Sequence, residues 1–150
     1  MRILIVEDDK AVAELIRRVL RPLDAETYLA YDWAGLERAL KLFEFDAICL
    51  DLGLPDSRTH ETLSKIKSLK MSHSRTAIMV ITGQPMLTRL QAEEAGADSF
   101  LRKEEALERG TLIRSISAVI ARVVRPNAQL EHQMELARQA TEHVVQGMKE

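Results

Sequence analysis

The chain has 150 residues, of which 46% are hydrophobic and 29% charged, with a net charge of −2; this composition is typical of one globular domain and excludes the strongly basic surface of a nucleic-acid-binding module. Cys49 is its single cysteine, which excludes an internal disulfide and fits a reducing compartment. The N-terminal apolar run is too short for a signal peptide and no apolar run is long enough to span a membrane, so we expect a cytoplasmic protein that binds neither nucleic acid nor membrane.

The first half of the chain alternates short apolar runs with helical patterns. Residues 3–6 (ILIV) predict a strand, and apolar residues at helical spacing from Val12 to Val19 predict a helix that Asp9 caps. A second strand is predicted at 27–30 (TYLA), followed by a helix over 36–43 that begins after Asp32. The next run, 47–50 (AICL), is almost continuously apolar, as a strand covered on both faces of a sheet must be.

The second half repeats this alternation and then changes character. A weak helical pattern around 63–66 precedes a strand at 78–81 (IMVI), and a helix over 87–90 is predicted to end at Gly96. A strand at 99–101 (SFL) and a helix over 113–123 follow. Pro126 interrupts the last helix, and the residues after it are polar and helix-prone. We therefore predict a domain at 1–125 and a C-terminal helical extension at 126–150.

Five strand–helix units in succession predict parallel strands joined by right-handed crossovers. A closed barrel of this kind needs eight units, so the expected fold is an open α/β sheet. We predict a doubly wound, five-stranded parallel sheet with strand order 2-1-3-4-5 and a flavodoxin-like arrangement. In such sheets ligands bind beyond the carboxyl ends of the strands, where the strand order reverses.

The predicted strands end in residues of complementary charge. They are Glu7 and Asp8 after the first strand, Asp51 after the third, Thr82 at the end of the fourth and Lys103 after the fifth. One strand-end acid is usually only a turn or cap residue. Three carboxylates that meet at one edge of a sheet repel one another unless a cation lies between them. The pattern therefore favours a cation site at this edge.

Four segments together resemble the receiver domain of two-component response regulators, the family of the chemotaxis regulator. They are ILIVEDD (3–9), DLGLPD (51–56), ITG (81–83) and GADSFLRK (96–103). The resemblance covers about residues 1–124 and keeps all five strand–helix units in register. Any one of these segments is a weak signal, whereas the set is specific.

The resemblance implies a phosphorylation site with a magnesium ion. Asp51 would accept a phosphoryl group from a histidine kinase or a phosphotransfer protein. Asp8 would bind Mg²⁺ directly and Glu7 through a water, together with Asp51 and the backbone carbonyl of Gly53. Such ligands suit Mg²⁺, which prefers oxygen donors and retains waters.

The resemblance also assigns the residues around the phosphoryl group. Lys103 would neutralise one phosphoryl oxygen, and Thr82 would move to hydrogen-bond another. Phe100 would then rotate inward as the switch aromatic, unless it is an ordinary, half-buried strand residue. Gln84 lies two residues beyond Thr82, where it either affects the lifetime of the phosphoryl group or is a surface glutamine.

Two positions depart from the family pattern. Glu104 follows Lys103 where the family usually has proline. A cis bond before a residue other than proline costs about 2.5–4 kcal/mol, so we expect a trans bond here. Thr59 stands where receivers usually carry glycine, so we expect an altered loop into the following helix.

The preferred function is a stand-alone response regulator receiver that signals by binding an unidentified output protein. Its enzymatic activity would be at most self-phosphorylation and autodephosphorylation. A Mg²⁺-dependent phosphohydrolase with an aspartate nucleophile would need D-x-D after the first strand, and an FMN carrier would be repelled by three acids there. A receiver-fold scaffold that is not controlled by phosphorylation remains the fourth alternative, although all the expected site residues are present.

The C-terminal extension carries a heptad stripe. Its members are Leu130, Met134, Ala137, Thr141, Val144 and Met148, spaced 4, 3, 4, 3, 4. With about three heptads and small residues in the seam, an isolated coiled coil would be marginal. The extension either folds back on its own domain or pairs with another chain. We favour a homodimer through the helix at 113–123 and residues 127–150.

Overall fold

The computed structural model describes residues 1–87, 89–124 and 126–149; within 126–149 it describes the side chains of 135–144 and 146–148. The elements in chain order are β1 (Arg2–Val6), α1 (Lys10–Leu20), the 3₁₀ helix η1 (Arg21–Leu23), β2 (Glu26–Ala30), α2 (Trp33–Leu42), β3 (Ala47–Leu50), α3 (Thr59–Ser72), β4 (Ala77–Thr82), α4 (Arg89–Glu94), β5 (Ser99–Arg102), α5 (Lys103–Ala106), α6 (Thr111–Val123) and α7 (Pro126–Lys149).

The five strands form one parallel sheet in the order β2-β1-β3-β4-β5, which confirms the predicted fold. The register sets the level at which each strand ends. Val6 of β1 pairs with Leu50 of β3, and Thr82 of β4 pairs with Arg102 of β5. The residues that follow β1, β3 and β5 therefore emerge at one edge of the sheet, the carboxyl edge.

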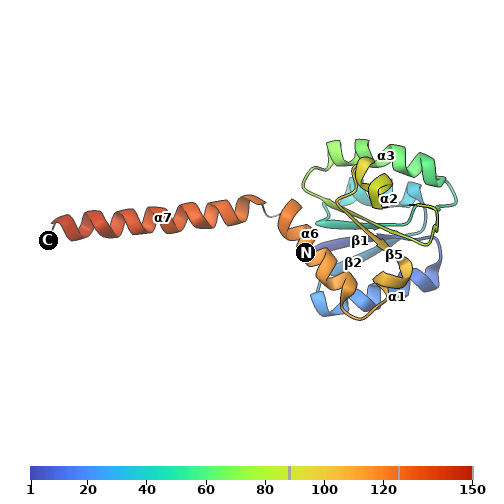
Figure 1. The fold of residues 1–150 in the computed structure, drawn as a ribbon, viewed down its shortest axis with the longest axis horizontal. Helices are drawn as coiled ribbons and strands as arrows, with labels where there is room; N and C mark the ends of the chain where they lie inside the picture. The colour runs from blue at the N-terminus through green and yellow to red at the C-terminus, as the bar shows by residue number, and fades with distance from the viewer. Residues whose placement is uncertain (88, 125, 150) are drawn as a thin grey trace.

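Helices cover both faces of the sheet (Figure 1). Helices α2, α3 and α4 pack on one face, the α2–α4 face, and α1 and α6 pack on the other, the α1–α6 face. Successive strand residues point to opposite faces: Leu4 lies on the α2–α4 face, and its neighbours Ile3 and Ile5 lie on the α1–α6 face. This two-sided burial explains the continuous apolar runs of β1, β3 and β4.

The helix starts in the first half follow the predicted caps. The Asp9 carboxylate accepts hydrogen bonds from the backbone N–H groups of Ala11 and Val12 at 2.9 and 3.2 Å. Asp32 accepts one from the N–H of Gly35 at 2.6 Å. Each carboxylate satisfies N–H groups that have no partner within the helix, and it complements the helix dipole.

The second half differs from the prediction in three places. Leu87 was expected to begin the fourth helix, but α4 is shorter and Leu87 lies buried in the loop before it. A short helix, α5, precedes α6, and α6 begins earlier than predicted, at Thr111. These differences arise because an apolar residue packs equally well from a loop as from a helix, so periodicity does not locate the boundary.

The two departures from the receiver pattern have ordinary backbone. The Lys103–Glu104 peptide bond is trans, as are all peptide bonds among the residues that the structure describes, and this confirms the expectation. Thr59 begins α3 and has no positive φ, so its position does not require glycine.

Helix α7 leads away from the sheet (Figure 1). It begins at Pro126, a position at which proline is compatible with a helix because the first N–H has no helical partner. Its described side chains are all exposed. Leu130 and Met134 of the predicted stripe lie outside the described side chains. Within the part of the chain that the structure describes, no helix combines the length and apolar character that crossing a membrane requires.

Candidate functional site

Backbone hydrogen bonds fix the acidic residues at the carboxyl edge. The N–H of Asp51 donates to the carbonyl of Val6 at 3.0 Å, and the N–H of Glu7 donates to the carbonyl of Ala30 at 2.9 Å. These bonds continue the sheet by one residue beyond β1 and β3. The first acid after each strand is thus held in a defined position, as a preorganised binding site requires.

Three carboxylates meet at this edge. One carboxylate oxygen from each of Glu7, Asp8 and Asp51 lies within 4.8 Å of the others. Glu7 and Asp51 are buried, with exposed fractions of 1% and 6%, whereas Asp8 is exposed. The cluster offers hard oxygen ligands and one side open to solvent, which suits a cation that retains waters, such as Mg²⁺.

Lys103 reaches the same cluster from the start of α5. Its Nζ lies 3.1 Å from the Glu7 carboxylate and 3.5 Å from Oδ2 of Asp51. Partial burial opposes the charge of Lys103, but the Asp51 and Glu7 carboxylates outweigh that effect and raise the pKa of the ammonium. Lys103 therefore remains charged at neutral pH and neutralises part of the cluster.

One cation does not balance the buried acids. Burial and the nearby Asp51 charge raise the pKa of Glu7 to about 7, although the Lys103 ammonium acts in the opposite direction. Without a metal ion, Glu7 is therefore partly protonated near neutral pH. A divalent cation would favour its ionised form.

Thr82 and Gln84 lie on the β4 side of the cluster. The hydroxyl of Thr82, which is fully buried, accepts a hydrogen bond from the backbone N–H of Gln84 at 3.0 Å. The side chain of Gln84 extends toward the loop after β3, where a Cβ added to Gly53 would lie 3.3 Å from its amide nitrogen. Gly53 follows Asp51 by two residues, so this loop and the loop after β4 meet above the carboxyl edge.

Phe100 is buried, with an exposed fraction of 4%. It packs on the α2–α4 face with Leu87 and Ala92. The guanidinium groups of Arg89 and Arg102 lie 5.7 and 5.5 Å from its ring centre. The ring is therefore buried, not half-buried as the alternative reading of an ordinary strand residue expected.

Sequence reasoning missed two residues near the site. Asp56, from the loop after β3, caps α2 across the fold: its carboxylate accepts from the N–H groups of Trp33 and Ala34 at 2.7 and 3.0 Å. Arg102 donates from its guanidinium to the carbonyls of Gln84 and Leu87. Asp56 is the last residue of the DLGLPD segment, so its place in that motif could have drawn attention to it. No local pattern in the sequence points to Arg102.

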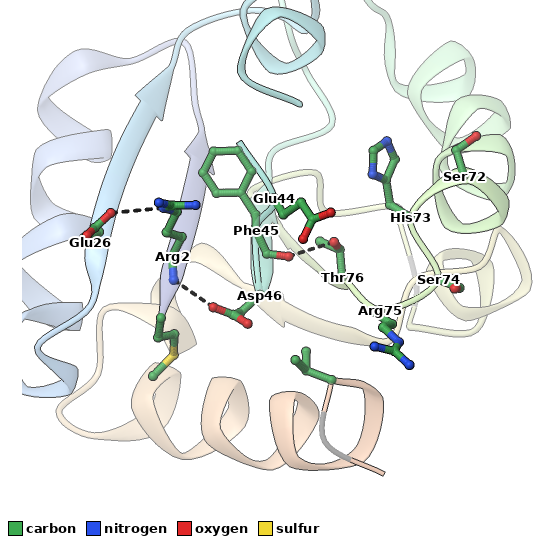
Figure 2. A pocket seen from close by; sticks show the side chains of 12 residues that line it. Arg2, Glu26, Glu44, Phe45, Asp46, Ser72, His73, Ser74, Arg75 and Thr76 are labelled. Carbon is green, nitrogen blue, oxygen red and sulfur yellow. Dashed lines mark hydrogen bonds and ion pairs between the residues drawn. The ribbon is translucent and has the colours of Figure 1, made fainter. Parts of the chain in front are cut away.

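A cavity of about 640 Å³ lies at the opposite, amino edge of the sheet (Figure 2). Its charged side chains have both signs, and several bind one another. Arg2 pairs with Glu26 at 3.1 Å, and the carboxylate of Asp46 accepts the N–H of Arg2 at 2.8 Å. The hydroxyl of Thr76 donates to the carbonyl of Phe45 at 2.7 Å. These mutual bonds make the cavity a weaker candidate than the acidic cluster.

The family model of the response regulator receiver domain matches residues 3–115. The chain belongs to this family of receiver domains. Receiver domains of two-component systems are phosphorylated on an aspartate, bind Mg²⁺ at an acidic pocket, and interact with histidine kinases and output proteins. In the receiver described here, Glu7, Asp8 and Asp51 form an acidic cluster.

Known proteins resemble this receiver over most of its length. The cell cycle response regulator CtrA of Brucella ovis is 31% identical over 126 residues, which are 81% of this chain and 51% of CtrA. The receiver thus spans about half the length of the curated relatives it matches.

Solved structures share its fold. A signal receiver domain from Bermanella marisrubri is 28% identical with a TM-score of 0.67, and the match covers 79% of this chain and 97% of that one. A response regulator from Burkholderia pseudomallei, solved with a phosphorylated aspartic acid, a calcium ion and citrate, is 24% identical with a TM-score of 0.62, over 92% of this chain and 74% of that one.

Proposed function

We propose that this receiver is a phosphorylation-controlled signalling module whose phosphoryl acceptor is Asp51. The donor would be a histidine kinase or a phosphotransfer protein. Mg²⁺ would be held by Glu7, Asp8, Asp51 and the carbonyl of Gly53. The observation that carries the proposal is that Asp51 lies 3.5 Å from Lys103 and within 4.8 Å of the two other acids. A nucleophile, a cation site and a fixed ammonium are thus adjacent.

The contacts of Asp51 support a role as nucleophile. Its Oδ1 accepts the N–H of Leu52 at 3.0 Å, which fixes the carboxylate, while Oδ2 faces Lys103. Oδ2 would attack phosphorus and form an acyl phosphate as the bond to the donor nitrogen breaks. A bound Mg²⁺ would supply positive charge against the phosphoryl oxygens. The Lys103 ammonium would bind another of these oxygens.

Thr82 and Phe100 are the proposed switch. The oxygen of Thr82 accepts the N–H of Gln84, so its hydroxyl proton can rotate toward another acceptor, such as a phosphoryl oxygen. Phe100 is already buried, and the guanidinium groups of Arg89 and Arg102 lie near its ring. Phosphorylation would therefore stabilise this buried position rather than create it, by favouring one of two packing arrangements.

The test is phosphorylation by acetyl phosphate in the presence of Mg²⁺, followed by intact-mass spectrometry. Wild type should gain one phosphoryl group, and Asp51→Asn should gain none. Asp24→Asn is the matched control, because Asp24 has a positive φ of 51° that asparagine tolerates well, and it lies outside the site. Labelling of Asp51→Asn at the wild-type rate would exclude Asp51 as the acceptor.

Beryllofluoride separates this proposal from a scaffold that does not respond to phosphorylation. This phosphoryl mimic should bind wild type only when Mg²⁺ is present and should not bind Asp51→Asn. A scaffold with a merely inherited acidic cluster would show no Mg²⁺-dependent binding.

We further propose that the receiver forms a homodimer through α6 and α7. Four members of the heptad stripe lie along α7 with exposed side chains: Ala137, Thr141, Val144 and Met148. Val144 and Met148 are 63% and 81% exposed. Arg138 pairs with Glu135 and Glu142 of its own helix, so the charged residues stabilise α7 itself and leave the stripe for another chain.

A further inference from the structure

Arg102 joins β5 to the loop that follows β4. Its Nη1 donates to the carbonyl of Gln84 at 2.6 Å, and its Nη2 donates to the carbonyl of Leu87 at 2.7 Å. One planar guanidinium thus bridges both ends of the segment 84–87. A lysine would reproduce this bridge poorly, because its donors lie on one nitrogen and lack the fixed, planar fork of arginine.

The bridged segment leads back to the phosphorylation site. Gln84, whose carbonyl Arg102 holds, donates its own N–H to the hydroxyl of Thr82 at 3.0 Å, and its side-chain amide lies near Gly53. Thr82 is also the direct ladder partner of Arg102 across β4 and β5. Arg102 therefore fixes the backbone of the residue that contacts both Thr82 and the loop after Asp51.

The same guanidinium contacts the proposed switch aromatic. It lies 5.5 Å from the centre of the Phe100 ring, and Leu87, whose carbonyl it holds, packs in the same buried cluster as Phe100. The backbone N–H of Arg102 donates to the Glu105 carboxylate at 3.2 Å, which secures the base of the arginine at the start of α5. The Arg102 guanidinium thus lies beside the Phe100 ring and also binds the loop.

We propose that Arg102 is a positioning residue for phosphorylation. Its guanidinium holds segment 84–87 in the arrangement that presents Thr82 and Gln84 to the phosphoryl group and keeps Phe100 inward. Without it, the loop takes up this arrangement only part of the time. The inference rests on the proposed phosphorylation of Asp51, and it adds a residue that itself makes no contact with the phosphoryl group.

The test compares Arg102→Ala with Arg89→Ala in the full chain. Arg89 is the matched control, because its guanidinium also lies beside the Phe100 ring but pairs with the exposed Glu93 carboxylate and not with the loop carbonyls that Arg102 binds. Arg102→Ala should weaken Mg²⁺-dependent beryllofluoride binding about tenfold, as expected if the loop is competent about a tenth of the time. Arg89→Ala should bind within about twofold of wild type, because the two carbonyl bonds remain.

Two further readouts distinguish positioning from loss of structure. Hydrogen exchange of the amides in 83–87 should be faster in Arg102→Ala and unchanged in Arg89→Ala. Guanidinium ion at low millimolar concentration should partly restore beryllofluoride binding to Arg102→Ala, whereas Arg102→Lys should restore little. If Arg102→Ala does not fold, the same measurements on Arg102→Lys decide the question.

The failures of the two proposals differ. If wild type itself binds no beryllofluoride, the proposed phosphorylation fails, and hydrogen exchange of 83–87 still tests the bridge. If wild type binds and Arg102→Ala binds equally well, the positioning role is overturned, whether or not exchange of the loop has changed.

Discussion

Glu7 is buried beside Asp51, so its charge is poorly balanced when no metal ion is bound. Its pKa is raised from the ordinary value of 4.5 to about 7, first by burial and then by the Asp51 charge. At about 1.4 kcal/mol for each pKa unit, ionising Glu7 in the folded, metal-free protein costs about 3 kcal/mol. Glu7→Gln keeps the shape of the side chain and removes this cost.

The direction in which stability changes with pH follows from the protons that Glu7 binds in the folded and unfolded chain. Below pH 4.5 Glu7 is protonated in both the folded and the unfolded chain, and it does not alter the free energy of unfolding. Between pH 4.5 and 7 the unfolded chain releases this proton while the folded protein retains it, so stability falls as the pH rises. Above pH 7 both states are ionised, and the full cost applies.

Urea unfolding of the full chain in EDTA, from pH 5 to pH 8, measures this effect. Wild type should lose about 2–3 kcal/mol more stability than Glu7→Gln over this range. Glu26→Gln is the control. Glu26 is an exposed acid whose pKa is lowered by its hydrogen bond to Arg2, so it is ionised in the folded protein over this pH range. The stability of the variant should therefore change with pH as that of wild type does. Mg²⁺ should recover most of the lost stability of wild type at pH 8. Parallel pH profiles for wild type and Glu7→Gln in EDTA would refute the reasoning.

Three further predictions concern the same chain. Asp8→Asn should melt at a higher temperature than wild type in EDTA and gain little from Mg²⁺, and equal melting temperatures in EDTA would count against repulsion within the cluster. Asp56→Ala should lose about 1 kcal/mol in urea unfolding because it removes one of the two carboxylates that cap α2; an unchanged midpoint would show that Asp32 alone is enough to cap this helix. A chain ending at Arg125 should sediment as a monomer and the full chain as a dimer. If both proteins sediment as monomers at micromolar concentrations, the homodimer proposal is wrong.

The fold could be predicted from the sequence because strands buried on both faces of a sheet appear as uninterrupted apolar runs. Residues 47–50 are apolar without interruption, and β3 lies between two strands and two layers of helices. The end of that run locates Asp51, and the same reasoning locates Glu7 after β1. Helix caps such as Asp9 were also visible, because capping is a local interaction.

The contacts around β4 and β5 could not be predicted from the sequence, because they join residues that are far apart in it. The carbonyls of Gln84 and Leu87 meet Arg102 only through the path of a loop, and no periodicity describes such a path. Leu87 was assigned to a helix because it is apolar, whereas it packs from the loop. The two arginines near the Phe100 ring are likewise not revealed by its own strand pattern.

The division of the core by the sheet has a mechanical consequence. Phe100 and Leu101 are neighbours on the edge strand β5, yet Phe100 packs on the α2–α4 face and Leu101 on the α1–α6 face, with Ile116 of α6. A shift of the β5 backbone would therefore alter the packing on both faces, including that of α6. Helix α7, which follows α6 in the chain, has 24 residues and is about 36 Å long. A tilt of about 5° at its base would displace its far end by about 3 Å.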